Sequence, residues 1–242
     1  MKLAIVIPAR MGSQRFPGKP LADLCGKPMV AWVYERAVAS GVAEQVVVAT
    51  PDDEILGACA ARGIAAIRTR ADHPSGTDRI AEAVIHLDCD AVINVQGDEP
   101  LIRPETIRSC AQPFFERSEA VMTSVFAWCG EDEIENPAVV KVVTDLDGRA
   151  LYFSRYPIPF PRHPRSRPPK KHIGIYGYTR DVLRAFATWP PTCLEIAEGL
   201  EQLRFLEHGV AIHMAEGEGS ELAVDTPEQA DMVRRLLGGL VD

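Results

Sequence analysis

Short apolar runs alternate with helix-like segments along the first half of the chain, and this alternation limits the fold most strongly. The runs at residues 2–7, 45–50, 64–67 and 90–95 are rich in Val, Ile and Ala. Such continuous runs are typical of strands buried on both faces. The segments between and after them predict helices at about 28–40, 52–62, 76–87 and 104–117. The pattern therefore predicts an α/β fold with a doubly wound, mostly parallel sheet.

The pattern changes after about residue 130. Residues 138–155, AVVKVVTDLDGRALYFSR, hold an Asp-Gly pair between two strand-like runs, which predicts an antiparallel hairpin. Further elements are expected, namely strands at 172–178 and 210–214 and helices at about 180–187, 194–208 and 227–237. We therefore expect one domain over residues 1–242, with a mixed-strand elaboration at about 130–205.

Composition excludes several classes of protein. The 242 residues are 46% hydrophobic, which is enough for one large core, and the net charge of −8 argues against a nucleic-acid binder. None of the six cysteines forms a CxxC pair, so no zinc or redox signature is present. No apolar stretch approaches the roughly 20 residues of a membrane span. We expect a globular, cytoplasmic protein without a signal peptide.

The loop at residues 8–20 carries three cations and no acid, although the whole chain is acidic. Arg10, Arg15 and Lys19 follow the first predicted strand, and ligands of open α/β sheets bind at the carboxyl ends of the strands. Backbone N–H groups, two guanidinium groups and an ammonium group together suit a polyphosphate. The loop matches neither GxxxxGK[ST] nor GxGxxG, which disfavours a P-loop kinase or a dehydrogenase. A solvated surface loop is the alternative interpretation.

A family resemblance decides between these interpretations. The stretch IPARMGSQRFPGKPL resembles the signature loop of sugar-activating nucleotidyltransferases, and HPSGTDRIAEAV, NVQGDEPLI, HIGIYGY, LEQLR and AVDTPEQ follow in order. Over nearly the whole chain the sequence resembles the 3-deoxy-manno-octulosonate (Kdo) cytidylyltransferase family. The resemblance implies transfer of CMP from CTP to this acidic eight-carbon sugar, with magnesium, in a homodimer that serves lipopolysaccharide biosynthesis. Two positions depart from the family pattern, Phe16 and Pro74, and neither removes a charged group.

The resemblance assigns the nucleotide to the first part of the chain. Arg10, Arg15 and Lys19 would hold the CTP phosphates and offset the charge of the departing pyrophosphate. Contacts to cytidine would come from backbone and helix-start residues, namely Pro8, Ala9, Ser75, Gly76 and Thr77. From the residues alone, Ser75 could simply cap a helix, because Asp78 follows it by three positions.

Two aspartates far apart in the sequence are assigned to one magnesium ion. Asp98 follows the strand predicted at 90–95, and Asp225 precedes the helix predicted at 227–237. Magnesium prefers oxygen ligands and usually keeps several waters, so two aspartates and substrate oxygens are a plausible shell. Glu99 could compete for the role of Asp98, and Asp225 alone could be an acid that stabilises a helix start.

The sugar would be held by polar groups from the second half of the chain. The resemblance assigns to it Gln96, Arg155, His172, Tyr176, Glu201 and Gln202. From the residues alone, Tyr176 would be a core aromatic residue, and Glu201 and Gln202 would lie on a solvated helix face. The sugar's anomeric hydroxyl can attack the α-phosphate directly, so no covalent intermediate is needed. The identity of a general base stays open.

Other functions remain open at this point. The sequence does not separate Kdo from its 8-amino variant, and a sialic acid cytidylyltransferase is a further alternative. A nucleotide-sugar glycosyltransferase would use QGDEP as a metal motif but would not need the cations of the first loop. A nonenzymatic nucleotide sensor is a third class. The basic loop at 162–171 could close over anionic substrates or be a solvated loop, and we expect the elaboration to carry the dimer contacts.

Overall fold

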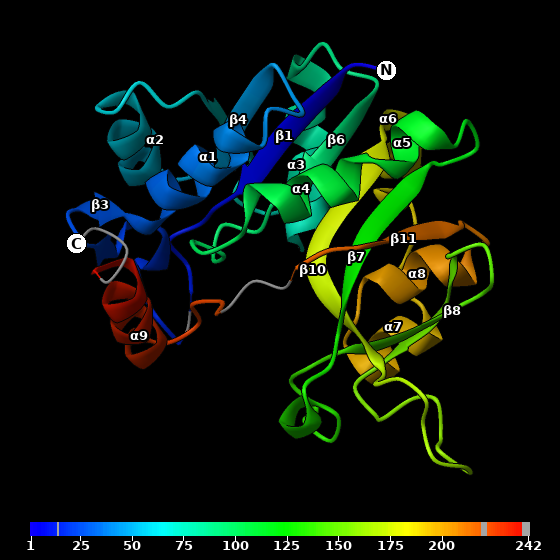
Figure 1. Ribbon diagram of the computed structural model, residues 1–242. Coiled ribbons are helices and arrows are strands. Elements are labelled where there is room, and N and C mark those ends of the chain that lie inside the picture. Colours follow the sequence, from blue (N-terminus) through cyan, green and yellow to red (C-terminus); the bar gives the residue numbers. More distant parts are fainter. Residues whose placement is uncertain (14, 219–221, 239–242) are drawn as a thin grey trace.

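The computed structural model describes residues 1–13, 15–218 and 222–238 and contains a nine-stranded sheet with helices on both faces (Figure 1). Seven strands form one path in the order β11-β7-β10-β6-β1-β4-β5. Their bounds are β1 (Leu3–Pro8), β4 (Gln45–Thr50), β5 (Ala66–Arg68), β6 (Ala91–Asn94), β7 (Met122–Trp128), β10 (Lys170–Thr179) and β11 (Ile212–Glu216). Strands β5, β4, β1 and β6 are parallel, and β7 and β11 are parallel to each other. Only β10 runs antiparallel to both of its neighbours on this path, so the expected mostly parallel sheet is confirmed.

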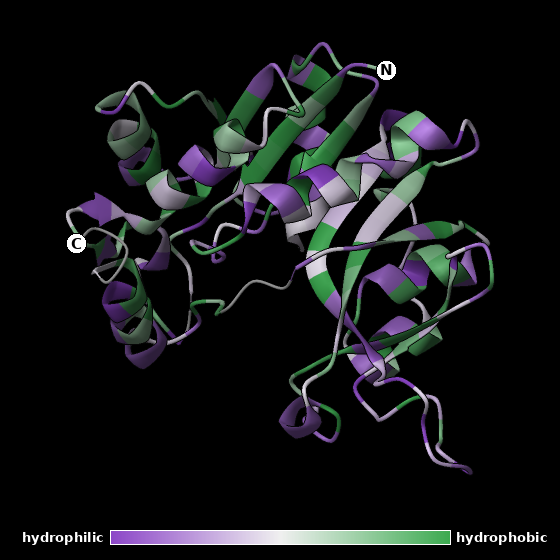
Figure 2. Cartoon of the chain, viewed as in Figure 1, coloured by the Kyte–Doolittle hydropathy of each residue, from purple (hydrophilic) through white to green (hydrophobic). Residues whose placement is uncertain are grey.

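Alternate residues of the central strands serve two separate cores. Ile5 and Ile7 of β1 belong to a cluster with Val33 of α1 and Ile107 of α4. The helices covering the two faces are α1 (Met29–Ser40), α2 (Asp53–Ala60), α3 (Gly76–Ala83), α4 (Pro104–Ala111), α5 (Pro113–Glu116), α6 (Arg180–Phe186), α7 (Cys193–Glu198) and α8 (Gln202–Glu207). The cluster on the other face includes Ala4 and Val6 of β1 with Ile80 of α3, Leu183 of α6 and Phe205 of α8. Figure 2 shows the resulting hydrophobic strands beneath helices with mixed surfaces. The fold is doubly wound, as the continuous apolar runs predict.

The expected hairpin is present and extends from β10. Strands β8 (Lys141–Thr144) and β9 (Ala150–Ser154) are antiparallel on either side of the Asp-Gly turn, and β8 also pairs with β10. The first part of β10 meets β8, its last part meets β6, and its register along β7 shifts between Ile173 and Tyr176. One strand therefore joins the central sheet to the elaboration.

Strand β7 was not among the predicted strands, and its polar residues explain the omission. Thr123 and Ser124 interrupt the apolar run, yet both are fully buried. The Thr123 hydroxyl donates to the Cys110 carbonyl at 2.7 Å, and the Ser124 hydroxyl donates to the Ile175 carbonyl at 2.8 Å. These tertiary hydrogen bonds remove the cost of burying the two hydroxyl groups.

The prediction of one helix over residues 194–208 is wrong, because two short helices cover this segment. Helix α7 ends at Gly199, which has a φ of 63°, and α8 begins at Gln202. Glycine accepts this left-handed conformation at little cost, so it stops a helix that apolar spacing alone would continue. The segment predicted at 104–117 is likewise divided, because α5 begins at Pro113.

The last helix, α9 (Pro227–Gly238), lies beside the small hairpin of β2 (Asp23–Leu24) and β3 (Lys27–Pro28). Thr226 caps it, since the Gln229 N–H donates to the Thr226 hydroxyl and the Gln229 side chain accepts from the Thr226 N–H. Thr226 and Gln229 stand three positions apart, which is the spacing of a capping box in sequence. In the described part of the chain, no helix is long and apolar enough to cross a membrane.

Candidate active site

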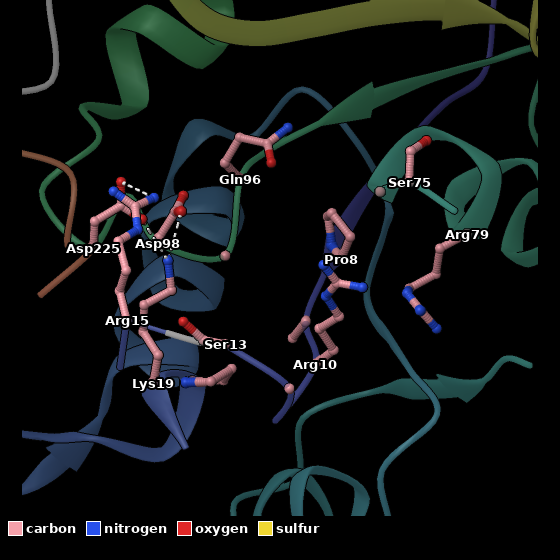
Figure 3. A pocket seen from close by; sticks show the side chains of 15 residues that line it. Pro8, Arg10, Ser13, Arg15, Lys19, Ser75, Arg79, Gln96, Asp98 and Asp225 are labelled. Carbon is pink, nitrogen blue, oxygen red and sulfur yellow. Dashed lines mark hydrogen bonds and ion pairs between the residues drawn. The ribbon is translucent and has the colours of Figure 1, made fainter. Parts of the chain in front are cut away.

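A cavity of about 700 Å³ lies at the carboxyl ends of β1 and β6 (Figure 3). Four segments line it: the loop after β1, the start of α3, the loop after β6, and the residue before the α9 cap. Most of the residues predicted for nucleotide and metal line it, namely Pro8, Ala9, Arg10, Arg15, Lys19, Ser75, Gly76, Asp98 and Asp225, and so does Gln96, which was predicted for the sugar. The sheet thus brings together residues that are far apart in the sequence, at the edge where open α/β sheets bind ligands.

The loop after β1 is fixed at several points along its backbone. The Ala9 N–H donates to the Ala49 carbonyl at 3.0 Å, and the Met11 N–H donates to the Asp52 carboxylate at 2.7 Å. Gly18 has a φ of 73° and donates its N–H to the Met11 carbonyl at 3.2 Å. A short 3₁₀ turn, Lys19–Leu21, follows at once. The loop therefore presents its cations from a defined backbone.

A glycine allows the loop after β6 to approach the end of β1. A Cβ atom at Gly97 would lie 2.7 Å from the Pro8 carbonyl oxygen, too close for any larger residue without movement of the backbone. This contact places the next residue, Asp98, against the cation loop. Gly97 is therefore needed for close approach rather than for an unusual φ.

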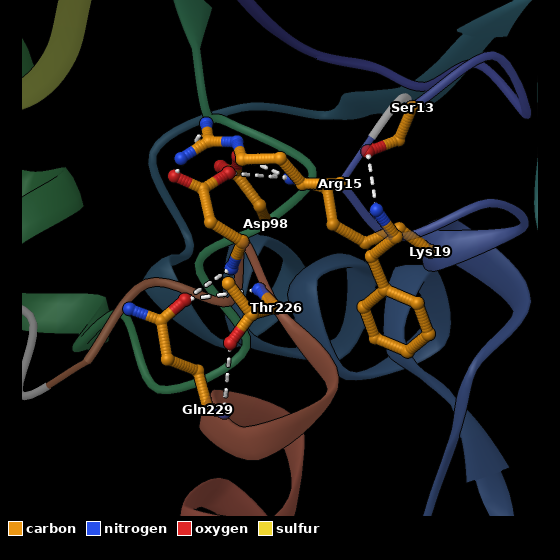
Figure 4. Close-up of polar contacts among 8 residues, drawn as sticks. Ser13, Arg15, Lys19, Asp98, Thr226 and Gln229 are labelled. Carbon is orange, nitrogen blue, oxygen red and sulfur yellow. Dashed lines mark hydrogen bonds and ion pairs between the residues drawn. The ribbon is translucent and has the colours of Figure 1, made fainter.

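Four charged side chains, which we call the charged cluster, meet at one end of the cavity: Arg15, Lys19, Asp98 and Asp225 (Figure 4). The Lys19 ammonium lies 2.9 Å from Asp98 Oδ2 and 3.1 Å from Asp225 Oδ1. The sum of these distances, 6.0 Å, is the largest separation that the two oxygens can have. Arg15 contacts the other oxygen of Asp225 at 3.0 Å. The two aspartates are therefore neighbours, and the cation between them here is Lys19.

A backbone contact explains how Asp225 reaches Asp98. The Val224 N–H donates to the Asp98 carbonyl at 2.9 Å, and Val224 is fully buried. Its cluster includes Leu24, Leu101 and Ala230, with Phe16 packed against it. The phenylalanine that departs from the family pattern therefore supports this part of the site.

The donor set suits a hard divalent cation that brings further ligands with it. The described residues contain no group of three or more His, Cys, Asp or Glu side chains placed to hold a metal. Two carboxylates can supply part of a magnesium shell, which is commonly completed by water and substrate phosphates. The chemistry of the pair fits magnesium but not a structural zinc site.

Arg79 also lines the cavity, and sequence reasoning missed it. Its side chain is 2% exposed, and it donates to the Thr69 hydroxyl at 2.6 Å and to the Arg70 carbonyl at 2.9 Å. Burial lowers the pKa of its guanidinium, and nearby Arg10 lowers it further. Its position one helical turn after Ser75, facing the cavity (Figure 3), is the signal that could have identified it.

A second group, which we call the polar cluster, holds four of the six residues predicted for the sugar, His172, Tyr176, Glu201 and Gln202, together with Thr77, which was predicted for cytidine. The Thr77 hydroxyl donates to Glu201 at 2.8 Å, and the Tyr176 hydroxyl donates to the Gln202 side-chain oxygen at 3.3 Å. His172 lies 2.9 Å from the Ser124 hydroxyl. None of the five lines the 700 Å³ cavity, but Thr77 directly follows Gly76, which does. The two groups therefore adjoin at the start of α3.

Burial disfavours charge throughout the polar cluster. It raises the pKa of the Glu201 carboxyl, a shift that the hydrogen bond from Thr77 partly opposes. It lowers the pKa of His172 to about 3 and raises the pKa of the Tyr176 hydroxyl. The Gln202 amide nitrogen is buried and has no hydrogen-bond partner among the described residues. This donor is available to a polar ligand.

Arg155 lies apart from both groups of contacts. Its Nε donates to the Glu198 carbonyl at 2.8 Å, and a terminal nitrogen donates to the Pro137 carbonyl at 3.1 Å. The neighbouring Lys141 is fully buried, and its ammonium donates to three backbone carbonyls, including that of Arg155 at 2.9 Å. The predicted role of Arg155 as the cation for the sugar carboxylate stays a prediction.

Comparisons with known proteins identify relatives over nearly the full length. The cytidylyltransferase family model matches residues 4–212. A 3-deoxy-manno-octulosonate cytidylyltransferase of Acidobacterium capsulatum is 47% identical over 96% of this chain and 95% of its own length. One of Pseudomonas syringae is 48% identical over 97% of this chain and 98% of its own length.

Solved structures share the fold. A CMP:2-keto-3-deoxy-manno-octonic acid synthetase complexed with CTP superposes with a TM-score of 0.96 at 43% identity, covering 99% of this chain and 100% of that one. A nucleotidyl transferase from Methanothermobacter has a TM-score of 0.66 at 14% identity, covering 99% of each chain, which shows the fold alone.

Proposed function

Because this chain belongs to the 3-deoxy-manno-octulosonate cytidylyltransferase family, we propose that it transfers CMP from CTP to the anomeric hydroxyl of Kdo, giving CMP-Kdo and pyrophosphate. The observation that carries this proposal is the cavity that three cations of one loop and two carboxylates line together, with two of the cations paired to the carboxylates. A nucleotide-sugar glycosyltransferase would not need this loop of cations after the first strand.

The transfer needs a substitution at the α-phosphorus. A bond forms from the anomeric oxygen to phosphorus, and the hydroxyl gives up its proton to a base or to water. The bond from phosphorus to the α–β bridging oxygen breaks, so pyrophosphate leaves with that electron pair. Arg10, Arg15 and Lys19 hold the phosphates and offset the negative charge that grows on the leaving group. Asp98 and Asp225 would hold magnesium, which when bound supplies positive charge at the phosphates.

The polar cluster would hold the sugar next to the nucleotide. A sugar with many hydroxyl groups needs donors and acceptors at fixed positions, and the cluster offers both in a partly buried setting. Glu201 and the Tyr176 hydroxyl can accept or donate, and the unpaired Gln202 amide nitrogen can donate to a sugar oxygen. Gln96, whose side chain contacts Asn94 at 3.1 Å, lies between the two groups.

We place this reaction in the cytoplasm, within lipopolysaccharide biosynthesis, and in a homodimer. Support for the dimer comes from apolar side chains exposed on the elaboration: Leu151 and Ile196 are 61% and 70% exposed, and Phe160 is 85% exposed. An interface between two chains would cover these side chains. Light scattering at micromolar concentration should show twice the chain mass, and a monomer would contradict the assignment.

The test of function is an assay over nucleotides and sugars. Purified protein with CTP, Mg²⁺ and Kdo should release pyrophosphate and form CMP-Kdo, and EDTA should stop the reaction. Running 8-amino-Kdo and sialic acid in parallel decides between the sugars. Turnover that persists in EDTA, or a preference for ATP or UTP, would overturn the proposal. Absence of turnover with any sugar, despite CTP binding, would favour a nucleotide sensor.

A further inference from the structure

The Lys19 ammonium lies where a cation shared by Asp98 and Asp225 would be expected. Its side chain is 14% exposed, against 32% for Asp98 and 37% for Asp225. It is the least exposed member of the charged cluster and the only one that contacts both carboxylates. Carboxylates this close repel each other, and a positive charge between them removes much of the repulsion.

The carboxylates are fixed more firmly than the ammonium. The Val224 N–H donates to the Asp98 carbonyl, and the Asp225 N–H donates to the Gln229 side chain at 2.7 Å. Each aspartate is therefore held by a hydrogen bond of its own backbone, close to a short side chain. Lys19 is tied by its backbone N–H to the Phe16 carbonyl at 3.1 Å. Its ammonium stands at the end of a flexible four-carbon side chain. The ammonium is therefore the member that can move.

We propose that Lys19 is a resident counter-ion of the metal site, which it leaves for the nucleotide phosphates when metal and nucleotide bind together. This inference rests on the proposed function, because that function supplies the phosphates. A divalent cation that enters alone must displace the ammonium group from both carboxylates. When phosphates are present, Lys19 exchanges two carboxylates for phosphate oxygens, and the carboxylates become free for the metal.

Positive coupling between metal and nucleotide follows from this exchange. If the nucleotide draws Lys19 away from the aspartates, it raises the affinity for metal, and the metal raises the affinity for nucleotide by the same factor. Lys19 thereby gains a role distinct from its phosphate contact. The two roles predict opposite effects of a substitution at Lys19 on two affinities. Removing the ammonium weakens nucleotide binding but strengthens binding of the metal alone.

The test is a titration with Mn²⁺, an oxygen-binding divalent cation that can be followed by electron paramagnetic resonance, on the full chain without nucleotide. Lys19→Met should bind Mn²⁺ at least about fivefold more tightly than the wild type, the lower end of ordinary coupling factors. The control Lys27→Met, which removes an exposed lysine paired with Glu35 outside the cavity, should match the wild type. Adding Asp98→Asn to Lys19→Met should abolish the gain in Mn²⁺ affinity.

Repeating the titration with CTP present measures the coupling itself. CTP should raise Mn²⁺ affinity in the wild type and raise it much less in Lys19→Met. Lys19→Gln is a second variant, and circular dichroism melts show that each protein is folded. Mn²⁺ affinities in folded Lys19→Met and Lys19→Gln that equal or fall below the wild-type value would overturn the counter-ion role while leaving the reaction standing. Failure of the sugar assay would leave this titration unaffected.

Discussion

The charged cluster and the polar cluster adjoin at the start of α3 but handle charge in opposite ways. In the charged cluster, Lys19 and Arg15 neutralise Asp98 and Asp225 by direct contact, with partial access to solvent. In the polar cluster, burial raises the pKa of Glu201 and lowers that of His172, so the groups are driven toward neutral forms. One region keeps its charges and pairs them, and the other suppresses charge.

The difference matches the chemistry of the two proposed substrates. A triphosphate with a divalent metal needs full charges of both signs, and paired side chains can exchange partners when those ions arrive. A sugar ring needs donors and acceptors in fixed directions, which buried and hydrogen-bonded groups supply with little reorganisation. Substitutions should therefore affect turnover in the charged cluster and sugar recognition in the polar cluster.

The largest effect is expected from the two aspartates. Asp98→Asn and Asp225→Asn should each lower kcat by about a hundredfold or more, because each removes a carboxylate from the proposed magnesium site. The double variant should be little worse than either single variant, since groups that act as one unit are not additive. Steady-state kinetics at saturating Mg²⁺ measures all three. If the losses of activity in the double variant were fully additive, Asp98 and Asp225 would act independently and would not share one metal.

A smaller but still large loss is expected from the loop cations. Arg15→Ala and Lys19→Ala should each cost about 2–4 kcal/mol at the transition state, by analogy with other groups that stabilise developing charge. Arg62→Ala is the matched control, because Arg62 is an exposed arginine just after α2 that does not line the cavity, and its guanidinium donates to the Ala58 carbonyl. Near-native kcat/KM in both variants would show that the loop at residues 8–20 is a solvated surface loop with no role in the reaction.

The polar cluster should respond through the sugar. Glu201→Ala and Tyr176→Phe are expected to raise the KM for Kdo about tenfold or more, since each removes one hydrogen-bonding group from a buried site. Calorimetric CTP affinity should change little. Glu201→Gln, which keeps the shape and the acceptor for Thr77, separates loss of the carboxylate from loss of packing. A defect confined to CTP binding would assign these residues to the other cluster.

The smallest effect concerns stability and pH. The pKa of His172 is about 3 in the folded protein against 6.5 for the free side chain, so between these values the unfolded chain binds the proton and the folded chain does not. The stability from this group is complete above pH 6.5 and is lost as the pH falls toward 3. From pH 7 to pH 5 the free energy of unfolding should drop by about 1–2 kcal/mol more in the wild type than in His172→Gln.

Urea denaturation at the two pH values measures this difference. The exposed His163→Gln is the matched control. Equal pH dependence in wild type and His172→Gln would show that His172 is not held neutral, and would weaken the contrast between the clusters.

Local patterns predicted those parts of the fold that local interactions stabilise. Strands β1, β4 and β6 and the helix cap at Ser75 agree with the sequence predictions, because apolar runs and caps act within a few residues. Strand β7 was missed because the partners of Thr123 and Ser124 lie on other elements. The insertion of β10 between β6 and β7 likewise depends on pairing between distant segments.

For the site, the resemblance named residues but could not give their contacts. It assigned Lys19 to phosphates and Asp98 and Asp225 to magnesium, and the ion pairs among these three are visible only in the folded chain. Arg79 went unnoticed because the hydroxyl and the carbonyl that accept from its guanidinium come together with it only in the folded chain, and its spacing of one helical turn from Ser75 was not used.

The hydrogen bond from Val224 to the Asp98 carbonyl has a consequence for the order of assembly. All nine strands of the sheet precede Val224 in the sequence, so a ribosome releases the material for the whole sheet before it releases Asp225. Domains of this size begin to fold during synthesis. The sheet can therefore be complete while the cavity still has one carboxylate. A folded sheet is thus no measure of a finished cavity.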